Sequence, residues 1–445
     1  MLTDRQGNAL SGATAEAAAL YDRALEAYNL YRGDPVALVD QAIEAAPDFA
    51  IARILKAYLF ALSTEPAATA AAKEIVLDLK KLRLCDREAS HVAALGQLVK
   101  GEWSAAAVAL DFHNMRYPRD LAALQAGHLM DFFRANARNL RDRLARALPE
   151  WDRRMPGYSI LLGMYAFGLE EAGDYAKAED AGREAVDLEP LDCWAHHAVA
   201  HVLEMQGRAE EGVEWMDSRV AFWSGDDNLF KVHNWWHQAM FHLSLDQPNA
   251  ALALYDAELR KGESGVAADL IDASSLLWRM MLAGADVGDR WLPLSKAWDQ
   301  HADGALYSFN DWHAVMTYLG AGRPDQVARI LGAYQGTHEQ DSEQRAWARK
   351  TGAALIEGFA AFWRKDYGVA VDRLYKARYI ANTFGGSHAQ RDVIDVTLLK
   401  AATHGGFADL AGSLSNERTA LKPASPANKR KAARPRAPCV MARAF

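Results

Sequence analysis

Glycine residues recur along this chain at a spacing of 34 residues, and this spacing is its most restrictive feature. Gly173 and Gly207 are 34 residues apart, and Pro190 stands midway between them. Gly33 and Gly101 are separated by 68 residues, which is two such intervals. Periods of about 20–50 residues predict a stacked array of small units, because one unit cannot bury its apolar face without its neighbours.

The segments between these breakers are predicted to be helical. Ala and Leu are abundant, apolar residues recur at i, i+3, i+4 and i+7, and the alternation of Val, Ile and Thr that is typical of strands is scarce. The pattern of tetratricopeptide repeats is matched by Gly173, Tyr175, Ala178, Ala185 and Pro190. The chain is therefore predicted to be all-α, a tetratricopeptide-like solenoid of helical hairpins.

The repeat is regular only between about residues 87 and 260, and the spacers outside this range vary in length. A regular superhelix does not need varied spacers, so we expect the array to curl until its C-terminal helices close the concave groove. Four sections are predicted: degenerate repeats in 1–86, core repeats in 87–260, groove-closing repeats in 261–414, and a disordered basic tail in 415–445.

Length and composition exclude several classes of protein. With 445 residues, of which 50% are hydrophobic, the chain can bury a large core. It has no run of about 18 apolar residues and no basic-then-apolar start, so neither a membrane span nor a signal peptide is predicted. Its three cysteines, Cys85, Cys193 and Cys439, are far apart, which predicts a reducing cytoplasm and disfavours a thiolate zinc site.

The net charge of −8 is unevenly distributed. From Ser415 onward there are eight Lys or Arg residues and one acid, which gives +7 and leaves −15 on residues 1–414. An acidic body repels phosphates, so nucleic-acid binding is not predicted. The basic, proline-containing tail is interpreted as a dispensable extension, with an anionic-partner tether as the alternative.

The first polar motif is an H-x-x-x-H-x-x-E run in a core repeat. If Pro190 closes one unit, the next begins at Cys193, and His197, His201 and Glu204 occupy positions 5, 9 and 12 of its first helix. In repeats of this kind those positions face the concave groove. The phase therefore predicts where a ligand binds but does not identify the ligand.

Two further motifs have a similar phase. In the run His-Asn-Trp-Trp-His at 233–237, His233 and His237 share one helix face because they are i and i+4. In the run Phe-Asn-Asp-Trp-His at 309–313, His313 again stands beside a tryptophan. Each histidine taken singly is more often a satisfied core residue. Their shared phase favours one polar site in the groove.

The fourth motif, Gly-Gly-Ser-His-Ala-Gln-Arg-Asp at 385–392, predicts a helix start. Ser387 is the expected N-cap after a flexible glycine pair. Backbone donors at such a start suit an anion, and Arg391 can hold a carboxylate with two hydrogen bonds.

Two chemistries are compatible with these motifs. A divalent metal ion can be held by His197, His201 and Glu204 on one helix face, although the motif is not the H-E-x-x-H of zinc peptidases. A metal-free site, with a histidine as general base, is preferred, and no cofactor is favoured. No P-loop, G-x-S-x-G or G-x-G-x-x-G motif is present, so NTPase, serine hydrolase and dinucleotide functions have no support.

The four motifs, in this order, resemble those of the tetratricopeptide repeat protein 38 family, over roughly residues 20–405. Position 235 is Trp here, where the family pattern implies an aromatic residue. The resemblance implies an all-helical repeat fold and leaves the reaction open.

Two functions of different classes follow from these motifs. The first is a cytoplasmic hydrolase or lyase for a small polar molecule, with His237 and His313 as acid and base and with Asp311 and Glu204 orienting them. Substrate contacts are then expected from His197, His201, His233, Trp194, Trp236, His388, Gln390, Arg391 and Asp392. The second is a non-catalytic scaffold that binds a protein partner in an open groove. A homodimer is compatible with the many tryptophans, if they lie on the surface.

Overall fold

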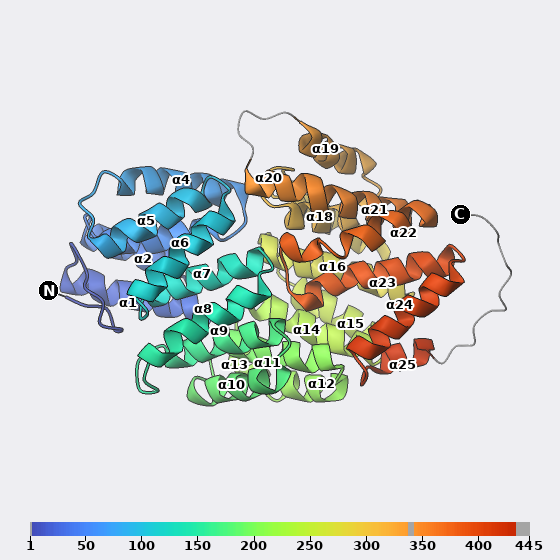
Figure 1. Cartoon of the computed structure of the whole chain (residues 1–445), viewed down its shortest axis with the longest axis horizontal. Coiled ribbons are helices and arrows are strands. Elements are labelled where there is room, and N and C mark those ends of the chain that lie inside the picture. Colours follow the sequence, from blue (N-terminus) through green and yellow to red (C-terminus); the bar gives the residue numbers. More distant parts are fainter. Residues whose placement is uncertain (1, 337–341, 433–445) are drawn as a thin grey trace.

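The computed structural model describes residues 2–336 and 342–432, and over these residues the chain is all-α (Figure 1). The only strand-like pairings there are two isolated bridges, from Thr3 to Ala9 and from Arg32 to Asn228. The predicted all-α array of helical hairpins is confirmed.

The array begins with eight helices: α1 (Ala15–Leu30), α2 (Pro35–Ala45), α3 (Ala50–Ala61), α4 (Pro66–Leu79), α5 (Asp86–Leu98), α6 (Trp103–Arg116), α7 (Leu121–Phe133) and α8 (Ala137–Ala147). Its middle contains α9 (Tyr158–Glu171), α10 (Tyr175–Leu188), α11 (Cys193–Gln206), α12 (Ala209–Asp217), α13 (Val220–Trp223), α14 (Lys231–Ser244), α15 (Pro248–Leu254) and α16 (Ala267–Ala283). The last part comprises α17 (Trp291–Trp298), α18 (Ser308–Gly320), α19 (Pro324–Gln335), α20 (Glu343–Trp347), α21 (Ala353–Trp363), α22 (Tyr367–Ala377), α23 (His388–His404), α24 (Ala408–Leu421) and α25 (Pro426–Ala432).

Short 3-10 or π segments join or extend some of these helices: Leu148–Glu150, Tyr255–Leu259, Gly288–Arg290, Ala348–Gly352 and Ala381–Thr383. Consecutive helices pack in pairs, as α9 with α10 and α21 with α22. The first helices of successive pairs, α9, α11, α14, α16 and α18, pack against one another in that order and form an inner layer. The repeat unit is thus the helical hairpin that the glycine spacing predicts.

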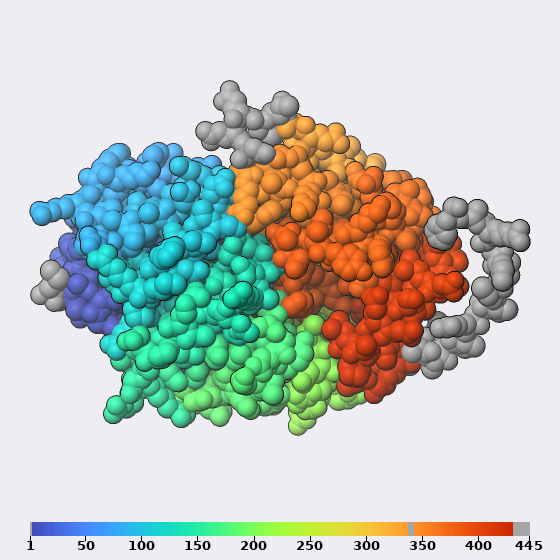
Figure 2. Space-filling model, viewed as in Figure 1, coloured from blue at the N-terminus to red at the C-terminus, as the bar shows by residue number. Residues whose placement is uncertain are grey.

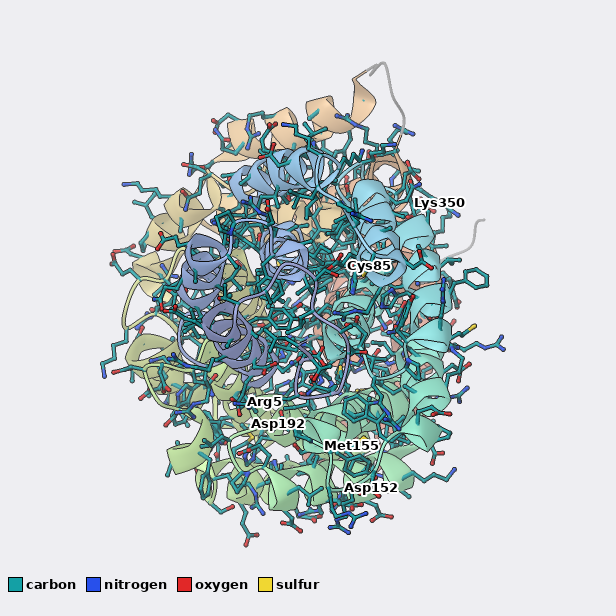
Figure 3. All side chains as sticks on the ribbon, turned by 90° about the vertical axis from the view of Figure 1, so that its left-hand side faces the viewer. Arg5, Cys85, Asp152, Met155, Asp192 and Lys350 are labelled. Carbon is teal, nitrogen blue, oxygen red and sulfur yellow. The ribbon has the colours of Figure 1, made fainter. Side chains whose placement is uncertain are left out.

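The two ends of the array meet, so the inner layer is enclosed. The Asn310 side-chain amide on α18 donates to the Thr64 carbonyl (3.0 Å), and the Ala267 N–H at the start of α16 donates to the Glu65 carboxylate (3.0 Å). Figure 2 shows the orange and red C-terminal surface meeting the cyan and green surface along a continuous boundary on the viewed face. The end-on view in Figure 3 shows helices around an interior filled with side chains.

Helix α23 completes this closure from within the C-terminal part. It packs against α11 and α16, and its first N–H, at His388, donates to the Glu171 carboxylate on α9 (2.8 Å). Elsewhere the Tyr307 hydroxyl donates to the Phe133 carbonyl (3.1 Å). The expected curling, with C-terminal helices covering the concave face, is present in the structure.

Most of the tryptophans belong to the core, although Trp363 is exposed. Six are almost completely buried: Trp103, Trp223, Trp236, Trp278, Trp298 and Trp312. Large aromatic side chains bury more apolar area than other residues, and this favours their interior location. Most tryptophans are therefore not available to a dimer interface. No helix in the described ranges is long and apolar enough to cross a membrane.

The prediction of a disordered tail from Ser415 onward is wrong for residues 415–432. Residues 415–421 belong to α24, and residues 426–432 form α25. The prediction of disorder rested on the positive charge of this segment, and composition does not show which charges have partners. In the fold, Arg418 pairs with Asp392 (2.7 Å). Residues 433–445, including Cys439, lie outside the described residues.

Candidate metal centre

Helix α11 is held at both ends by local features of the sequence. At its start the Asp192 carboxylate, labelled in Figure 3, accepts a hydrogen bond from the Ala195 N–H (3.0 Å). At its end Gly207 adopts a φ of 74°, a conformation that other residues rarely adopt. The helix therefore begins and ends where the 34-residue pattern predicts.

Four histidines converge between α11 and its inner neighbour α14. His197 and His201 share one face of α11, His233 and His237 share the facing side of α14, and one ring nitrogen from each lies within 4.8 Å of all the others. The ring centroids of His197 and His233 are 4.8 Å apart, and those of His201 and His237 are 4.5 Å apart. Two i, i+4 pairs on adjacent helices thus form a compact group of four imidazoles.

Carboxyl groups lie beside three of these rings, and two of them are within hydrogen-bond distance. The Nδ1 atom of His233 lies 2.8 Å from Asp272 Oδ2, and that of His237 lies 3.0 Å from Glu204 Oε2. The Nδ1 atom of His201 is 3.5 Å from Glu170 Oε2. A protonated Nδ1 that donates to a carboxylate leaves the Nε2 lone pair of the same ring available, which is the usual arrangement around a metal-bound histidine.

Burial lowers the pKa of three of the four imidazoles. Burial, reinforced by the neighbouring histidines, holds the pKa of His197 and that of His237 well below the ordinary value. Burial also lowers the pKa of His201 to about 4, despite the opposing effect of Glu171. Neutral imidazole is the form that binds metal, so no proton has to leave these three rings at neutral pH.

Several nitrogens in this group have no hydrogen-bond partner. They are Nδ1 of His197, both nitrogens of His201 and Nε2 of His237. Buried polar atoms are normally satisfied, and leaving them unpaired is costly. Around zinc, histidine nitrogens at about 2.0–2.1 Å from the ion lie about 3.4 Å apart. Small ring movements would therefore bring one nitrogen from each of the four histidines into range of a single ion.

Aromatic side chains border the four rings, and two of them are tryptophans. Trp236 stacks on His233 with ring centroids 5.3 Å apart and an interplanar angle of 14°. Trp194 lies against His197 with centroids 4.9 Å apart. These indoles exclude water from the rings, which strengthens electrostatic interactions there.

Glu170 and Glu171 border the group on the α9 side. Burial, together with the adjacent Glu171, raises the pKa of Glu170 well above its ordinary value, and neither carboxyl oxygen of Glu170 has a hydrogen-bond partner. Although burial opposes ionisation of Glu171, His388 and Arg391 lower its pKa to about 2. The pKa values of these two adjacent carboxyls are thus shifted in opposite directions.

The third motif is not part of this group. His313 Nδ1 lies 2.8 Å from the Phe309 carbonyl, and burial lowers the pKa of His313 to about 3. Asp311 accepts hydrogen bonds from the Gly304 N–H (3.1 Å) and the Tyr334 hydroxyl (2.8 Å). The expectation that Asp311 orients a catalytic histidine is therefore wrong, because Asp311 and His313 are neighbours in sequence whose side chains bond to different partners.

The fourth motif is occupied by contacts within the chain. Ser387 is the N-cap of α23 and forms a capping box with Gln390. The Arg391 guanidinium donates to the Gly385 and Gly386 carbonyls and lies 3.6 Å from the Glu171 carboxylate. The carboxylate that it contacts therefore belongs to this chain. His388 Nδ1 lies 3.0 Å from the Glu171 carboxylate.

Asp392, also expected to contact a substrate, is held by two arginines. It pairs with Arg418 (2.7 Å) and with Arg279 (3.3 Å). Arg279 is one of the interior residues that sequence reasoning missed, and it also donates to the Ala389 carbonyl (2.7 Å). These bonds fix the start of α23 against α16.

Sequence reasoning missed two of the carboxyls near the imidazoles, Glu170 and Asp272, and the sequence contains a signal for Glu170 only. Glu170 precedes Glu204 by one 34-residue period, so the repeat would have placed both in the groove. Asp272 follows His233 by 39 residues, because the π-helical segment Tyr255–Leu259 and the loop after it interrupt the period. Its approach to His233 depends on the packing of α14 on α16.

No family model matches this chain. Among solved structures, the crystal structure of the APC/C hetero-tetramer Cut9–Hcn1 is similar at 14% identity and a TM-score of 0.45, over 94% of this chain and 76% of that one. The structure of yeast Tom70 is similar at 13% identity and a TM-score of 0.32, over 93% of this chain and 86% of that one.

The class of this protein follows from its own hairpins: it is an all-α, tetratricopeptide-like helical-repeat protein whose array closes on itself.

Proposed function

We propose that this helical-repeat protein binds one divalent transition-metal ion inside its closed array, through one ring nitrogen each of His197, His201, His233 and His237. The observation that carries the proposal is the convergence of four buried imidazoles, three of them backed by carboxyl groups, with unpartnered nitrogens among them. A satisfied core histidine does not need this arrangement, whereas a metal ligand does.

This ligand set differs from the one that the sequence indicated. Glu204 is replaced as a ligand by the two histidines of α14, because its Oε2 atom already lies 3.0 Å from His237 Nδ1. In this role Glu204 fixes the tautomer of His237 instead of touching the ion.

The surrounding charges favour a divalent cation. Four neutral rings leave the ion's two positive charges uncompensated, and Glu204 and Asp272 are the buried carboxylates nearest to those rings. Nitrogen-only ligands suit Zn²⁺, Cu²⁺ or Ni²⁺ and disfavour Mg²⁺ and Ca²⁺, which prefer oxygen.

If the protein is an enzyme, we propose a hydrolase or lyase acting on a small polar molecule in the cytoplasm. An ion of this type supplies Lewis-acid chemistry when a coordination position is open. Cys85 and Cys193 are free thiols, which supports a reducing compartment.

The scaffold hypothesis requires an open groove. The motifs that a partner would contact are largely buried, and α23 packs against α11 and α16. A partner protein would therefore have to bind an outer face.

The test is metal content and affinity. Protein stripped of metal and reloaded with Zn²⁺ or Co²⁺ should bind one ion per chain, measured by elemental analysis and native mass spectrometry. His237→Ala should weaken binding by at least about 100-fold, because a ligand and its carboxylate contact are lost together. The visible absorption spectrum of the Co²⁺-loaded protein should be that of a cobalt ion bound by nitrogen ligands.

A matched control stands on the same helix. His242 is a partly exposed residue of α14 whose Nδ1 lies 2.7 Å from Gln247, so His242→Ala should leave affinity unchanged. If the unaltered protein binds no ion at micromolar concentrations, the metal proposal is wrong and the scaffold hypothesis gains.

A further inference from the structure

The segment of residues 418–428, which we call the C-terminal strap, lies against the metal-centre helix α11. It joins the end of α24 to the start of α25, and three of its polar residues, Lys422, Ser425 and Asn428, are buried. Lysine is rarely buried without a partner, so burial in a basic segment of this kind calls for a specific contact.

The first contact is at the end of α11. A Cβ atom added to Gly207 would lie 2.6 Å from the Ser425 backbone nitrogen, so the strap backbone touches the helix terminus directly. Gly207 is three residues beyond Glu204, which places the strap within one turn of the carboxylate that holds His237.

The second contact reaches that carboxylate. Lys422 Nζ lies 3.8 Å from Glu204 Oε1, while Glu204 Oε2 lies 3.0 Å from His237 Nδ1. Both side chains are largely buried, so solvent screens this attraction little. One carboxylate thus connects a metal ligand on one side with the strap on the other.

Ion pairs anchor the strap at its beginning. The Arg418 guanidinium contacts Asp392 through two hydrogen bonds, of 2.7 and 3.2 Å. The Asn428 side-chain amide donates to the Arg418 carbonyl (3.0 Å), which ties the far end of the strap back to its start. The hydrogen bond from Asn428 to Arg418 therefore closes the strap into a loop.

We propose that the C-terminal strap closes the four-histidine centre and sets the rate at which its ion exchanges with solvent. This inference rests on the proposed metal function. Lys422 holds Glu204 from the strap side, so the strap must detach from Glu204 for an ion to pass the end of α11. The strap is a kinetic barrier at one end of the enclosed inner layer.

The experiment measures how fast a chelator removes Co²⁺ or Zn²⁺ from the loaded full chain. Lys422→Met keeps the length and apolar stem of the side chain and removes its charge. It should speed ion loss by about tenfold, since one buried charged contact no longer holds the strap closed. A chain ending at Leu421, without the rest of the strap, should lose the ion faster still.

Two controls separate the strap from general loosening. Lys429→Met changes an exposed lysine on α25, and a chain ending at Ala432 retains every described residue of the strap, so both should release ion at the original rate. Circular dichroism melting of each metal-free variant reports whether the fold is kept. If the shortened chain does not fold, Lys422→Met alone decides.

The outcomes are distinguishable. Equal release rates in Lys422→Met and the unaltered protein, within about twofold, would overturn the strap proposal and leave the metal centre intact. Absence of any bound ion in the unaltered protein would overturn the metal function and the strap proposal with it.

Discussion

Glu204 and Asp311 are both buried carboxyl residues of histidine-containing motifs, yet their partners differ. Glu204 lies on His237, whereas Asp311 bonds to Gly304 and Tyr334. Burial, reinforced by the negative charge of Asp303, raises the pKa of Asp311 to about 7. A carboxyl of this kind is a structural acid that is protonated below neutral pH, not an orienter of a base.

Asp311→Asn tests this distinction at the level of one residue. The folded-state pKa lies above the unfolded value of 3.8, so Asp311 binds more protons in the folded state, and its contribution to stability is lost as pH rises from about 4 to 7. The free energy of unfolding of the variant relative to the unaltered protein should therefore increase by on the order of 2–4 kcal/mol between pH 4 and pH 8.

Urea denaturation at several pH values measures this difference, and ion affinity serves as the control. Asparagine cannot ionise but has nearly the same shape, so ion binding at the distant imidazoles should be unchanged. A difference in stability that does not vary with pH would contradict the assigned pKa. A loss of ion binding would mean that Asp311 contributes to the four-histidine metal centre.

At the scale of one element, α11 combines two tasks, because it builds a hairpin and carries two of the four imidazoles. Its end at Gly207 matters for both tasks. Gly207 and Gly173 occupy equivalent turns with φ values of 74° and 84°. Only Gly207 is covered by another segment, since nothing lies within 4 Å of a Cβ at Gly173.

Substituting alanine at each position separates backbone strain from contact with the strap. Gly173→Ala should lower the free energy of unfolding by about 1–2 kcal/mol, from the left-handed conformation alone. Gly207→Ala should lower it further and should also speed ion release, because the new methyl group displaces Ser425. Denaturation and chelator kinetics measure the two effects, and equal behaviour of both variants would mean that the strap does not press on this turn.

At the scale of the whole molecule, closure decides what can enter the inner layer. Contacts from α16 and α18 to the α3–α4 turn, and from α23 to α9, join distant parts of the sequence. Small-angle scattering should give a radius of gyration of about 22 Å, the value expected for a compact chain of this length. A much larger radius would mean an open solenoid in solution and would revive the scaffold hypothesis.

Much of the local structure can be predicted from the sequence. The turns at Gly173 and Gly207, the start of α11 at Cys193 and the Ser387 cap follow from residue types whose backbone preferences are strong. The phase of His197, His201 and Glu204 follows too, because helix geometry is the same in every repeat.

What only the tertiary structure decided is which side chains meet. The sequence by itself determined the helical hairpins, their turns and the inward direction of the histidines. It did not determine that Asp272 and Glu170 lie behind the imidazoles, that Arg391 is occupied by backbone carbonyls, or that Lys422 is buried. The physical reason is that these contacts join helices across irregular spacers, where small differences in packing choose each partner.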